Sequence, residues 1–449
     1  MFHQINYATF KNKKYQYLFF FILTIYTIFN GGNSNLSIQI NFILVSLLFL
    51  FCLKDKNYNL HLKNFYKDNQ KSILIYLIFI FYLIFQIVPL PVEMLKIFSP
   101  EKFKILGKFE GEISNSSISL ALSNSFFQIL NYSTLLIVVF VIKMIFYTDR
   151  HKNRFNLFLS FLGFITSIIA ITFYLNGNPD IFMIKNTFYK YASTGFFINR
   201  TIFAVFLLFS LISSLELLRN LQIKVNKKKD NFFLKIYIRL FVMFITIGIV
   251  TSFSRIGNFL FLVTILSYLI NEFYFTKIKN NSLKYIVILI LLIDILIVGL
   301  YFGGSKIVDR FYFLSNEFYE IYLDGINYSR FEIAKFSFFQ LKNYLFFGYG
   351  TGGFQNLFQL NFPRSNHLYA DHAHSDLVEF IGEFGLFGSS LLLLSISNFF
   401  INKNSYSFIN MIILFYLIIL LFFDFSLHSP IIQFLFVTSF TLNQKKLFS

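Results

Sequence analysis

Residues 126–175 read "FFQILNYSTLLIVVFVIKMIFYTDRHKNRFNLFLSFLGFITSIIAITFYL", which is two apolar runs joined by a basic segment. Each run is about 20 residues long, the length of a helix that crosses the hydrocarbon core of a bilayer. The rest of the chain repeats this pattern. Of its 449 residues, 56% are hydrophobic and 14% are charged, which is about half the charged share of a soluble domain. These features predict an all-α, polytopic integral membrane protein.

Apolar runs bounded by charged residues or by Gly, Pro and Asn clusters predict about twelve transmembrane helices. They lie near residues 17–30, 38–53, 72–89, 125–147, 155–175, 201–218, 233–253, 256–276, 284–302, 376–398, 406–424 and 429–443. The longest connection, residues 303–375, separates the ninth from the tenth. Loops of that length are usually functional or folded. We therefore expect residues 1–449 to form one transmembrane domain, with 303–375 as a loop within it.

The distribution of charge predicts the orientation in the membrane. If the N-terminus is cytoplasmic and the helices alternate, the cytoplasmic segments hold 24 basic and 4 acidic residues, and the opposite segments hold 14 and 15. This asymmetry predicts that both termini are cytoplasmic. It also accounts for the formal net charge of +17 without nucleic acid. A single cysteine, Cys52, excludes an intramolecular disulfide, and the apolar stretch near the start is expected to be the first span and not a cleavable signal peptide.

Under this topology the arginines of interest fall on the outer face. Arg200 starts a span, Arg255 lies between two spans with almost no loop, and Arg330 opens an amphipathic helix in the long loop. Each has a structural alternative: an interfacial arginine can extend its guanidinium to the headgroups, and loop arginines such as Arg310 and Arg364 are common. An arginine within the interface is costly unless it pairs or faces water.

The stretch "DHAHSDLVEFIGEFGLFG", residues 371–388, gathers ionisable side chains where the tenth span begins. Asp376, Glu379 and Glu383 share one helix face, and three glycines at intervals of three permit close helix packing. A capped, tightly packed helix explains Asp376 and the glycines, but it leaves the two glutamates and the two histidines, His372 and His374, unexplained. The spacing of the histidines is not that of a helical zinc site. Histidine as a general base is the simpler chemistry.

The stretch "HAHSDLVEFIGEFGLFG" resembles the signature of the O-antigen ligase and polymerase superfamily. His374, Ser375, Glu383, Gly385 and Gly388 take motif positions, with serine where asparagine is commoner. Further fragments agree in order along most of the chain: "LIFQIVPLPVEMLKIFSP", "INRTIFAVFLLF", "TSFSRIGNFLFL", "RFEIAKFSFFQLKNYLFFGYGTGGF" and "FDFSLHSPIIQF".

The resemblance implies a glycosyltransferase of the bacterial inner membrane. It would move a glycan from undecaprenyl pyrophosphate to lipid A–core or a similar acceptor at the periplasmic face, inverting the anomeric centre. No cofactor and no metal are expected, because arginine gives permanently charged phosphate contacts. Arg200, Arg255 and Arg330 would bind the pyrophosphate, and Arg255 would also stabilise its developing charge. His374 would activate the acceptor with support from His372, and Asp424 and His428 would lie behind them.

Two other functions remain open at this point. A repeat-unit polymerase of the same superfamily would share every motif, and the sequence leaves the sugar, the acceptor and the oligomeric state undetermined. A polysaccharide transporter would place ionisable residues in the middle of several spans. Asp294 is the only clear residue of that kind, so transport is the weaker alternative. Glu379 has no predicted role.

Overall fold

The computed structural model describes residues 2–108, 115–180, 189–223, 232–275, 322–323, 326–327, 329–363, 368–401 and 407–443. The longer helices are α1 (Phe2–Ile28), α2 (Asn35–Leu53), α3 (Lys56–Ile87), α6 (Leu122–Ile145), α7 (Asp149–Leu175), α8 (Arg200–Ile223), α9 (Phe232–Thr251), α10 (Arg255–Ile270), α15 (Asp376–Ile401), α16 (Phe408–Phe423) and α17 (Pro430–Asn443). The shorter elements are η1 (Asn30–Gly32), α4 (Val92–Phe98), α5 (Pro100–Leu106), η3 (Asn271–Phe275), β1 (Tyr322–Leu323), β2 (Ile326–Asn327), α13 (Arg330–Gln340), η5 (Leu341–Asn343), α14 (Phe354–Asn361) and η7 (Ser426–His428).

The predicted all-helical membrane architecture is confirmed in its general form. Within the described ranges, eight helices are long and apolar enough to cross a membrane: α2, α3, α6, α7, α8, α9, α10 and α15. Helices α16 and α17 are apolar but shorter, and α1 covers the first predicted span. The ninth predicted span, 284–302, lies outside the described residues together with Asp294, Arg310 and Arg364. The total of twelve spans therefore stays a prediction.

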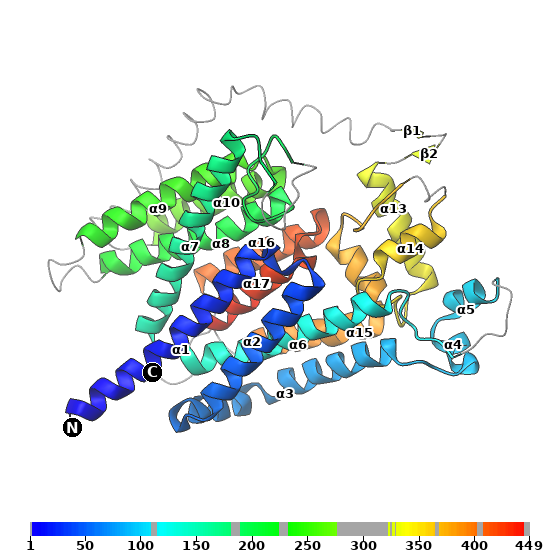
Figure 1. Ribbon diagram of the computed structural model, residues 1–449, viewed down its shortest axis with the longest axis horizontal. Helices are drawn as coiled ribbons and strands as arrows, with labels where there is room; N and C mark the ends of the chain where they lie inside the picture. Colours follow the sequence, from blue (N-terminus) through cyan, green and yellow to red (C-terminus); the bar gives the residue numbers. More distant parts are fainter. Residues whose placement is uncertain are drawn as a thin grey trace.

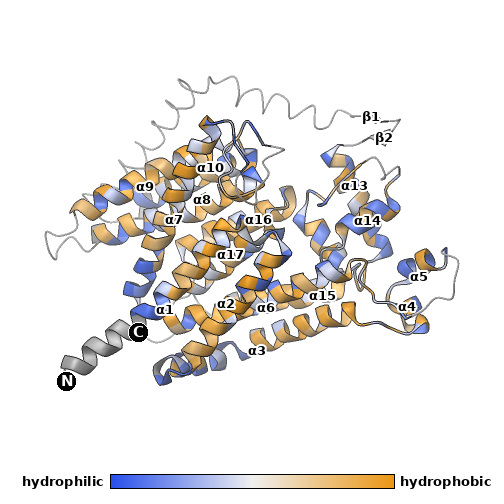
Figure 2. Cartoon of the chain, viewed as in Figure 1, coloured by the Kyte–Doolittle hydropathy of each residue, from blue (hydrophilic) through white to orange (hydrophobic). Residues whose placement is uncertain are grey.

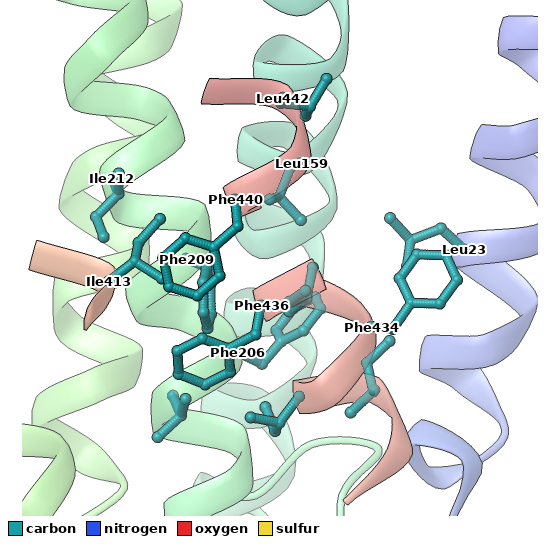
Figure 3. Packing of buried hydrophobic residues seen from close by; sticks show 14 of the residues in the cluster. Leu23, Leu159, Phe206, Phe209, Ile212, Ile413, Phe434, Phe436, Phe440 and Leu442 are labelled. Carbon is teal, nitrogen blue, oxygen red and sulfur yellow. The ribbon is translucent and has the colours of Figure 1, made fainter. Parts of the chain in front are cut away.

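Helix α8 forms the centre of the bundle. In its most apolar window 94% of the residues are buried, whereas the other candidate spans reach 33–50%. Phe206, Phe209 and Ile212 of α8 pack with Phe436 and Phe440 of α17 in the main hydrophobic core (Figure 3). The peripheral helices instead leave large apolar side chains exposed, such as Phe81 at 67% and Leu393 at 66%. Exposed apolar surface of this extent on helices of spanning length fits contact with lipid.

One end of the bundle carries a folded cap, which we define as α4, α5, α13, α14 and the segments that join α13 to α15. Figure 1 shows these elements together at the end where α15 begins. Within the cap, α13, α14 and the segments that join α13 to α15 form a second core that includes Ile333, Tyr349, Phe354 and Phe358. In Figure 2 the cap is more hydrophilic than the long helices beside it. Residues 329–363, which fall within the predicted loop 303–375, are therefore folded, and the loop as a whole stays a prediction.

The cap is joined to α15 by backbone hydrogen bonds at a kink. Gly385 has φ 64° and ψ 178°, which interrupts the helix. The N–H of Leu386 donates to the carbonyl of Leu345 at 2.7 Å, and the N–H of Tyr349 donates to the carbonyl of Gly382 at 2.9 Å. The expected role of the glycines was helix-to-helix packing. That interpretation holds in part for Gly388, which lies against Tyr82 of α3, but at Gly385 the glycine serves this kink and the cap.

Candidate active site

The three acidic residues at the start of α15 converge on a histidine from another element. Asp376, Glu379 and Glu383 share one face, as their spacing predicts, and all three are buried. That face meets η7, where His428 Nδ1 is hydrogen-bonded to Asp376. His428 Nε2 lies 3.4 Å from Glu379 Oε1 and 3.5 Å from Glu383 Oε2. Buried carboxylates require such partners because unpaired charge is costly in a low dielectric.

Glu379, which has no role in the sequence prediction, is the central member of this cluster. Its Oε1 lies 3.0 Å from His372 Nδ1, and its Oε2 accepts a 2.8 Å hydrogen bond from the backbone N–H of Ala373. Together with the His428 contact, this ties the segment before α15 to η7. We name Asp376, Glu379, Glu383, His372 and His428 the histidine–carboxylate cluster.

Asp376 and Glu383 also hold backbone from other elements. The N–H of Leu427 donates to Asp376 Oδ2 at 2.8 Å, and the N–H of Gly352 in the cap donates to Glu383 Oε1 at 2.6 Å. The interpretation of Asp376 as a helix-capping residue is therefore incomplete, because its carboxylate also forms hydrogen bonds with η7. The Glu383 carboxylate joins the folded cap of the bundle to α15 through its hydrogen bond with Gly352. Neither contact is visible in the sequence, since the partners lie 51 and 31 residues away.

Aromatic rings stack on the faces of the two cluster histidines, His372 and His428. His372 stacks on Phe425 with ring centroids 4.8 Å apart and an interplanar angle of 16°. His428 stacks on Phe380 at 4.2 Å and 20°. The motif histidine, His374, meets the same Phe425 edge-on at 5.3 Å. Phe425 thus lies between the two histidines of the opening stretch.

The two histidines before α15 differ in electrostatic environment. Burial of His374 and the nearby guanidinium of Arg330 lower the pKa of His374 to about 4. Burial also disfavours the charged form of His372, but the Glu379 carboxylate outweighs it and raises the pKa of His372 above its usual value. The pKa of His428 is likewise raised, because Glu379 and Asp376 outweigh the effect of its burial. At neutral pH His374 is the neutral imidazole.

Arg330 and Asp424 lie near this pair. Arg330 opens α13, which begins at an N-cap serine whose hydroxyl accepts from the N–H of Glu332 at 3.1 Å. Its side chain is exposed, and its charge acts on both His374 and Asp424. The carbonyl of Asp424 accepts from the N–H of Asp376 at 2.9 Å. Burial raises the pKa of the Asp424 carboxyl, which is hydrogen-bonded by the Ser426 hydroxyl.

Arg200 and Arg255 form a second group. They are the first residues of α8 and α10, and the Ser254 hydroxyl beside Arg255 donates to the Thr201 hydroxyl beside Arg200 at 3.1 Å. The guanidinium of Arg200 lies 5.3 Å from the centre of the Tyr189 ring. Both arginines are half-buried. The two helix starts are therefore adjacent, and side chains cap an N–H at each: Asn199 Oδ1 accepts from Thr201, and the Ser254 hydroxyl accepts from Gly257.

Contacts connect the start of α8 to the end of the bundle that carries η7. Phe197, three residues before α8, and Ile431, three residues after η7, both lie against Gly31. Helix α8 also contacts η7 itself. Of the predicted site residues, the structure brings the His372 and His428 rings within 5.3 Å of each other with Glu379 in contact with both. It places Arg330 within electrostatic reach of His374 and of Asp424, and it puts Arg200 and Arg255 at adjacent helix starts.

A metal site can be tested on the same residues. Among the described residues, His372, Glu379 and His428 offer donor atoms that all lie within 4.8 Å of one another. Both oxygens of Glu379, however, already accept hydrogen bonds, from His372 and from the N–H of Ala373. Hydrogen bonds to His372 and to Ala373 account for the position of Glu379, whereas His428 bonds Asp376 through Nδ1 and its buried Nε2 has no hydrogen-bond partner among the described residues. Asp371 and His374, which adjoin His372 in the sequence, are not part of this group.

A comparison with known protein families finds a match in the part of the chain that holds most of this site. Residues 240–393 match the model of the O-antigen ligase family. The matched stretch is about a third of the chain and contains Arg255, Arg330, both histidines before α15 and Glu383. No curated protein matches the chain. Residues 240–393 therefore match the O-antigen ligase family, which supports the resemblance that the motifs indicate.

Proposed function

We propose that the protein is an O-antigen ligase-like glycosyltransferase. Its donor would be a glycan on undecaprenyl pyrophosphate, and its acceptor a hydroxyl of lipid A–core or of a similar molecule. The reaction would take place at the periplasmic face of the inner membrane, with both termini in the cytoplasm. The match of residues 240–393 to the O-antigen ligase family supports the general activity. The donor, the acceptor and the membrane side are part of the proposal.

The observation that carries the proposal is the gathering of imidazole and guanidinium groups where α15 begins. His374 lies within the electrostatic reach of Arg330. His372, a member of the histidine–carboxylate cluster, is stacked on Phe425 and lies 3.0 Å from Glu379. An imidazole can take a proton from an acceptor hydroxyl. A guanidinium can bind phosphate oxygens and stabilise the charge that develops as the pyrophosphate leaves.

The second group of arginines supports binding of the leaving group. Arg200 and Arg255 begin adjacent helices, and helix N-termini favour anions through their unbonded N–H groups and dipole. Because arginine stays charged at every working pH, two or three guanidiniums can neutralise a pyrophosphate without a divalent metal. The reaction would be a direct displacement at the anomeric carbon, which inverts its configuration.

The first test compares activity and abundance of two variants. His374→Ala and Arg255→Ala are expected to lose glycan transfer while their membrane levels stay those of the wild type. The measurement is product formation in membranes together with immunodetection of the protein. Full activity in both folded variants would contradict the assignment.

The nearest alternative is a repeat-unit polymerase of the same superfamily, which would use the same donor chemistry with a second repeat unit as acceptor. Lipid profiles of a deletion strain distinguish the two. Loss of a ligase leaves long undecaprenyl-linked chains, and loss of a polymerase leaves single repeats. A transporter fits less well, because the described buried ionisable groups lie near helix ends: the histidine–carboxylate cluster where α15 begins, and Glu216, Arg219 and Glu272 near the ends of two other candidate spans.

A further inference from the structure

The two glutamates of the histidine–carboxylate cluster divide their oxygens between different partners. Glu379 Oε2 accepts from the N–H of Ala373 at 2.8 Å, and Glu383 Oε1 accepts from the N–H of Gly352 at 2.6 Å. The remaining oxygens, Glu379 Oε1 and Glu383 Oε2, both lie near His428 Nε2. Backbone hydrogen bonds therefore hold both glutamates so that one oxygen of each lies close to the same imidazole nitrogen.

His428 Nε2 is near both of these oxygens and is hydrogen-bonded to neither. It lies 3.4 Å from Glu379 Oε1 and 3.5 Å from Glu383 Oε2, and it has no hydrogen-bond partner among the described residues. The side chain is only 9% exposed, and a buried polar atom without a partner is costly. Because Nδ1 is bonded to Asp376, the ring cannot turn to give Nε2 another partner. Nε2 is therefore a buried nitrogen that lacks a partner beside two carboxylates.

The segment before α15 supplies a further donor atom to the same region. His372 Nδ1 is 3.0 Å from Glu379 Oε1, and the donor atoms of His372, Glu379 and His428 all lie within 4.8 Å of one another. A zinc ion with bonds of about 2.0–2.1 Å and tetrahedral angles separates its ligand atoms by about 3.3–3.4 Å. The separations of 3.0, 3.4 and 3.5 Å in the cluster are close to that value.

The neighbours of these donor atoms are those that metal ligands usually have. A histidine that binds a metal typically bonds its second ring nitrogen to a carboxylate, and this outer contact orients the ring. Asp376 has that position behind His428, and the backbone N–H groups have it behind the two glutamates. A cluster held only by hydrogen bonds would direct Nε2 to one of the two carboxylate oxygens. The absence of that bond among the described residues favours a shared ion.

We propose that His372, Glu379, Glu383 and His428 bind one divalent transition-metal ion, for which zinc is the best match. Two imidazoles and two carboxylates are zinc ligands, and four donors at these separations suit its tetrahedral geometry. The ion would take the place of the proton between His372 Nδ1 and Glu379 Oε1, with both imidazoles neutral. The His372 side chain is 28% exposed, which gives the ion a path from solvent.

The role of this ion would be structural. It would join the segment before α15, the first turns of α15 and η7, and it would not touch the pyrophosphate, which stays with the arginines. The inference therefore goes beyond the proposed function and does not depend on it. The spacing of His372 and His374 could not reveal the site, because the second imidazole comes from η7. Since Glu379, Glu383 and His428 are buried, we expect the ion to exchange slowly and to stay bound when a chelator is added to the folded chain.

The metal content of the wild-type chain is the first experiment, since it needs no substitution. The full chain is purified in detergent through a tag without histidine, dialysed against metal-free buffer and analysed by plasma mass spectrometry. We expect one zinc ion for each folded chain. A folded chain that keeps no transition metal, even when it is first equilibrated with zinc and then dialysed, would overturn the inference.

Variants locate the ion. His428→Asn and Glu379→Gln each remove one ligand, and we expect each to lower the zinc content by about tenfold or more. His374→Ala lies in the same turn but outside the ligand set, so it should keep its zinc. His61→Asn, in α3, is the matched control, because it changes a histidine that is stacked on Tyr147 away from the cluster. Zinc content equal to the wild type in both ligand variants would mean that the ion is adventitious.

Cobalt reports the geometry of the site without any substitution. Co²⁺ introduced in place of zinc should give the visible absorption of a four-coordinate ion with nitrogen and oxygen ligands. His374→Ala should give the same spectrum. A six-coordinate spectrum in the wild type would contradict the four-ligand site.

Unfolding gives a readout that is independent of activity. An ion that binds only the folded chain stabilises it, so excess chelator during heating should lower the unfolding temperature of the wild type by several degrees. Dye labelling of the buried Cys52 reports unfolding, and His428→Asn should show no such shift. An equal shift in both chains would exclude the cluster as the site.

The results separate this inference from the proposed function. If the folded wild type and His374→Ala hold zinc but the wild type transfers no glycan to any acceptor tested, the proposed function fails and the metal site stands. If a chain that holds no transition metal after equilibration with zinc transfers glycan, the metal site fails and the proposed function stands.

Discussion

The kink at Gly385 determines how the cap meets the acidic face of α15, and Gly385→Ala tests that role. A β-carbon at Gly385 would lie 2.3 Å from the carbonyl oxygen of Phe346 and 2.6 Å from the N–H nitrogen of Gly348. The backbone pair φ 64° and ψ 178° is in a region that only glycine occupies readily, at a cost of about 1–3 kcal/mol for other residues. Relieving the contact would also break the Leu386 and Phe387 hydrogen bonds to the cap, at about 1 kcal/mol each.

The expected loss in the free energy of unfolding is therefore about 3–5 kcal/mol. Gly177→Ala is the matched control, since Gly177 also has positive φ, 77°, but a β-carbon there meets nothing within 4 Å. That variant should lose only about 1 kcal/mol. Cys52 is buried and is the one cysteine of the chain, so the rate at which a thiol-reactive dye labels it on heating reports unfolding.

We expect Gly385→Ala to be labelled at a temperature several degrees below the wild type and to transfer glycan at least about tenfold more slowly, because Gly352 would no longer meet Glu383. Gly177→Ala should differ little in either measurement. If Gly385→Ala is labelled and transfers glycan as Gly177→Ala does, the kink is not needed to seat the cap, and the reasoning is refuted.

Three further outcomes are expected. Arg330→Ala should raise the pKa of His374 from about 4 toward its usual value, because a nearby positive charge is removed; an unchanged His374 titration by NMR would mean that the two side chains do not interact. His428→Asn should slow transfer by about tenfold, because it removes the imidazole that bonds Asp376 and lies against Glu379 and Glu383; an unchanged rate would mean that transfer does not need the histidine–carboxylate cluster. Chelation of divalent cations should leave the transfer rate unchanged, because guanidiniums neutralise the pyrophosphate; loss of activity restored by one metal ion would point to His372, Glu379 and His428 as its ligands.

The membrane architecture was predictable because its cause is local. Runs of about 20 apolar residues must be spanning helices, whatever their neighbours. Helices α2, α3, α6 to α10 and α15 accordingly lie where the apolar runs predict them. The start of α15 at Asp376 and the start of α13 at Arg330 were also predictable, since each follows a serine with acidic residues in the first turn.

The site was predictable only as a set of residue types at one end of the bundle. The spacing of Asp376, Glu379 and Glu383 indicates a shared face, but it does not reveal that His428, more than 40 residues later, lies against that face. A buried carboxylate in a spanning helix is a signal that a partner must exist. The identity of that partner depends on tertiary packing, as does the stacking of His372 on Phe425.

The kink at Gly385 was missed for a similar reason. Glycines at intervals of three fit a helix-packing stripe as well as a helix interruption, and only the approach of residues 345–348 distinguishes the two. Gly388 takes the first role and Gly385 the second. The sequence pattern alone allows both.

The most direct test of the central claim is a transfer assay with the purified chain, a glycan linked to undecaprenyl pyrophosphate and a lipid A–core acceptor. We predict one undecaprenyl pyrophosphate released for each glycan joined, inversion at the anomeric carbon, and no release by a folded variant that carries both Arg255→Ala and His374→Ala. Undiminished release by that variant, or none by the folded wild type with lipid A–core or repeat-unit acceptors, would contradict the account.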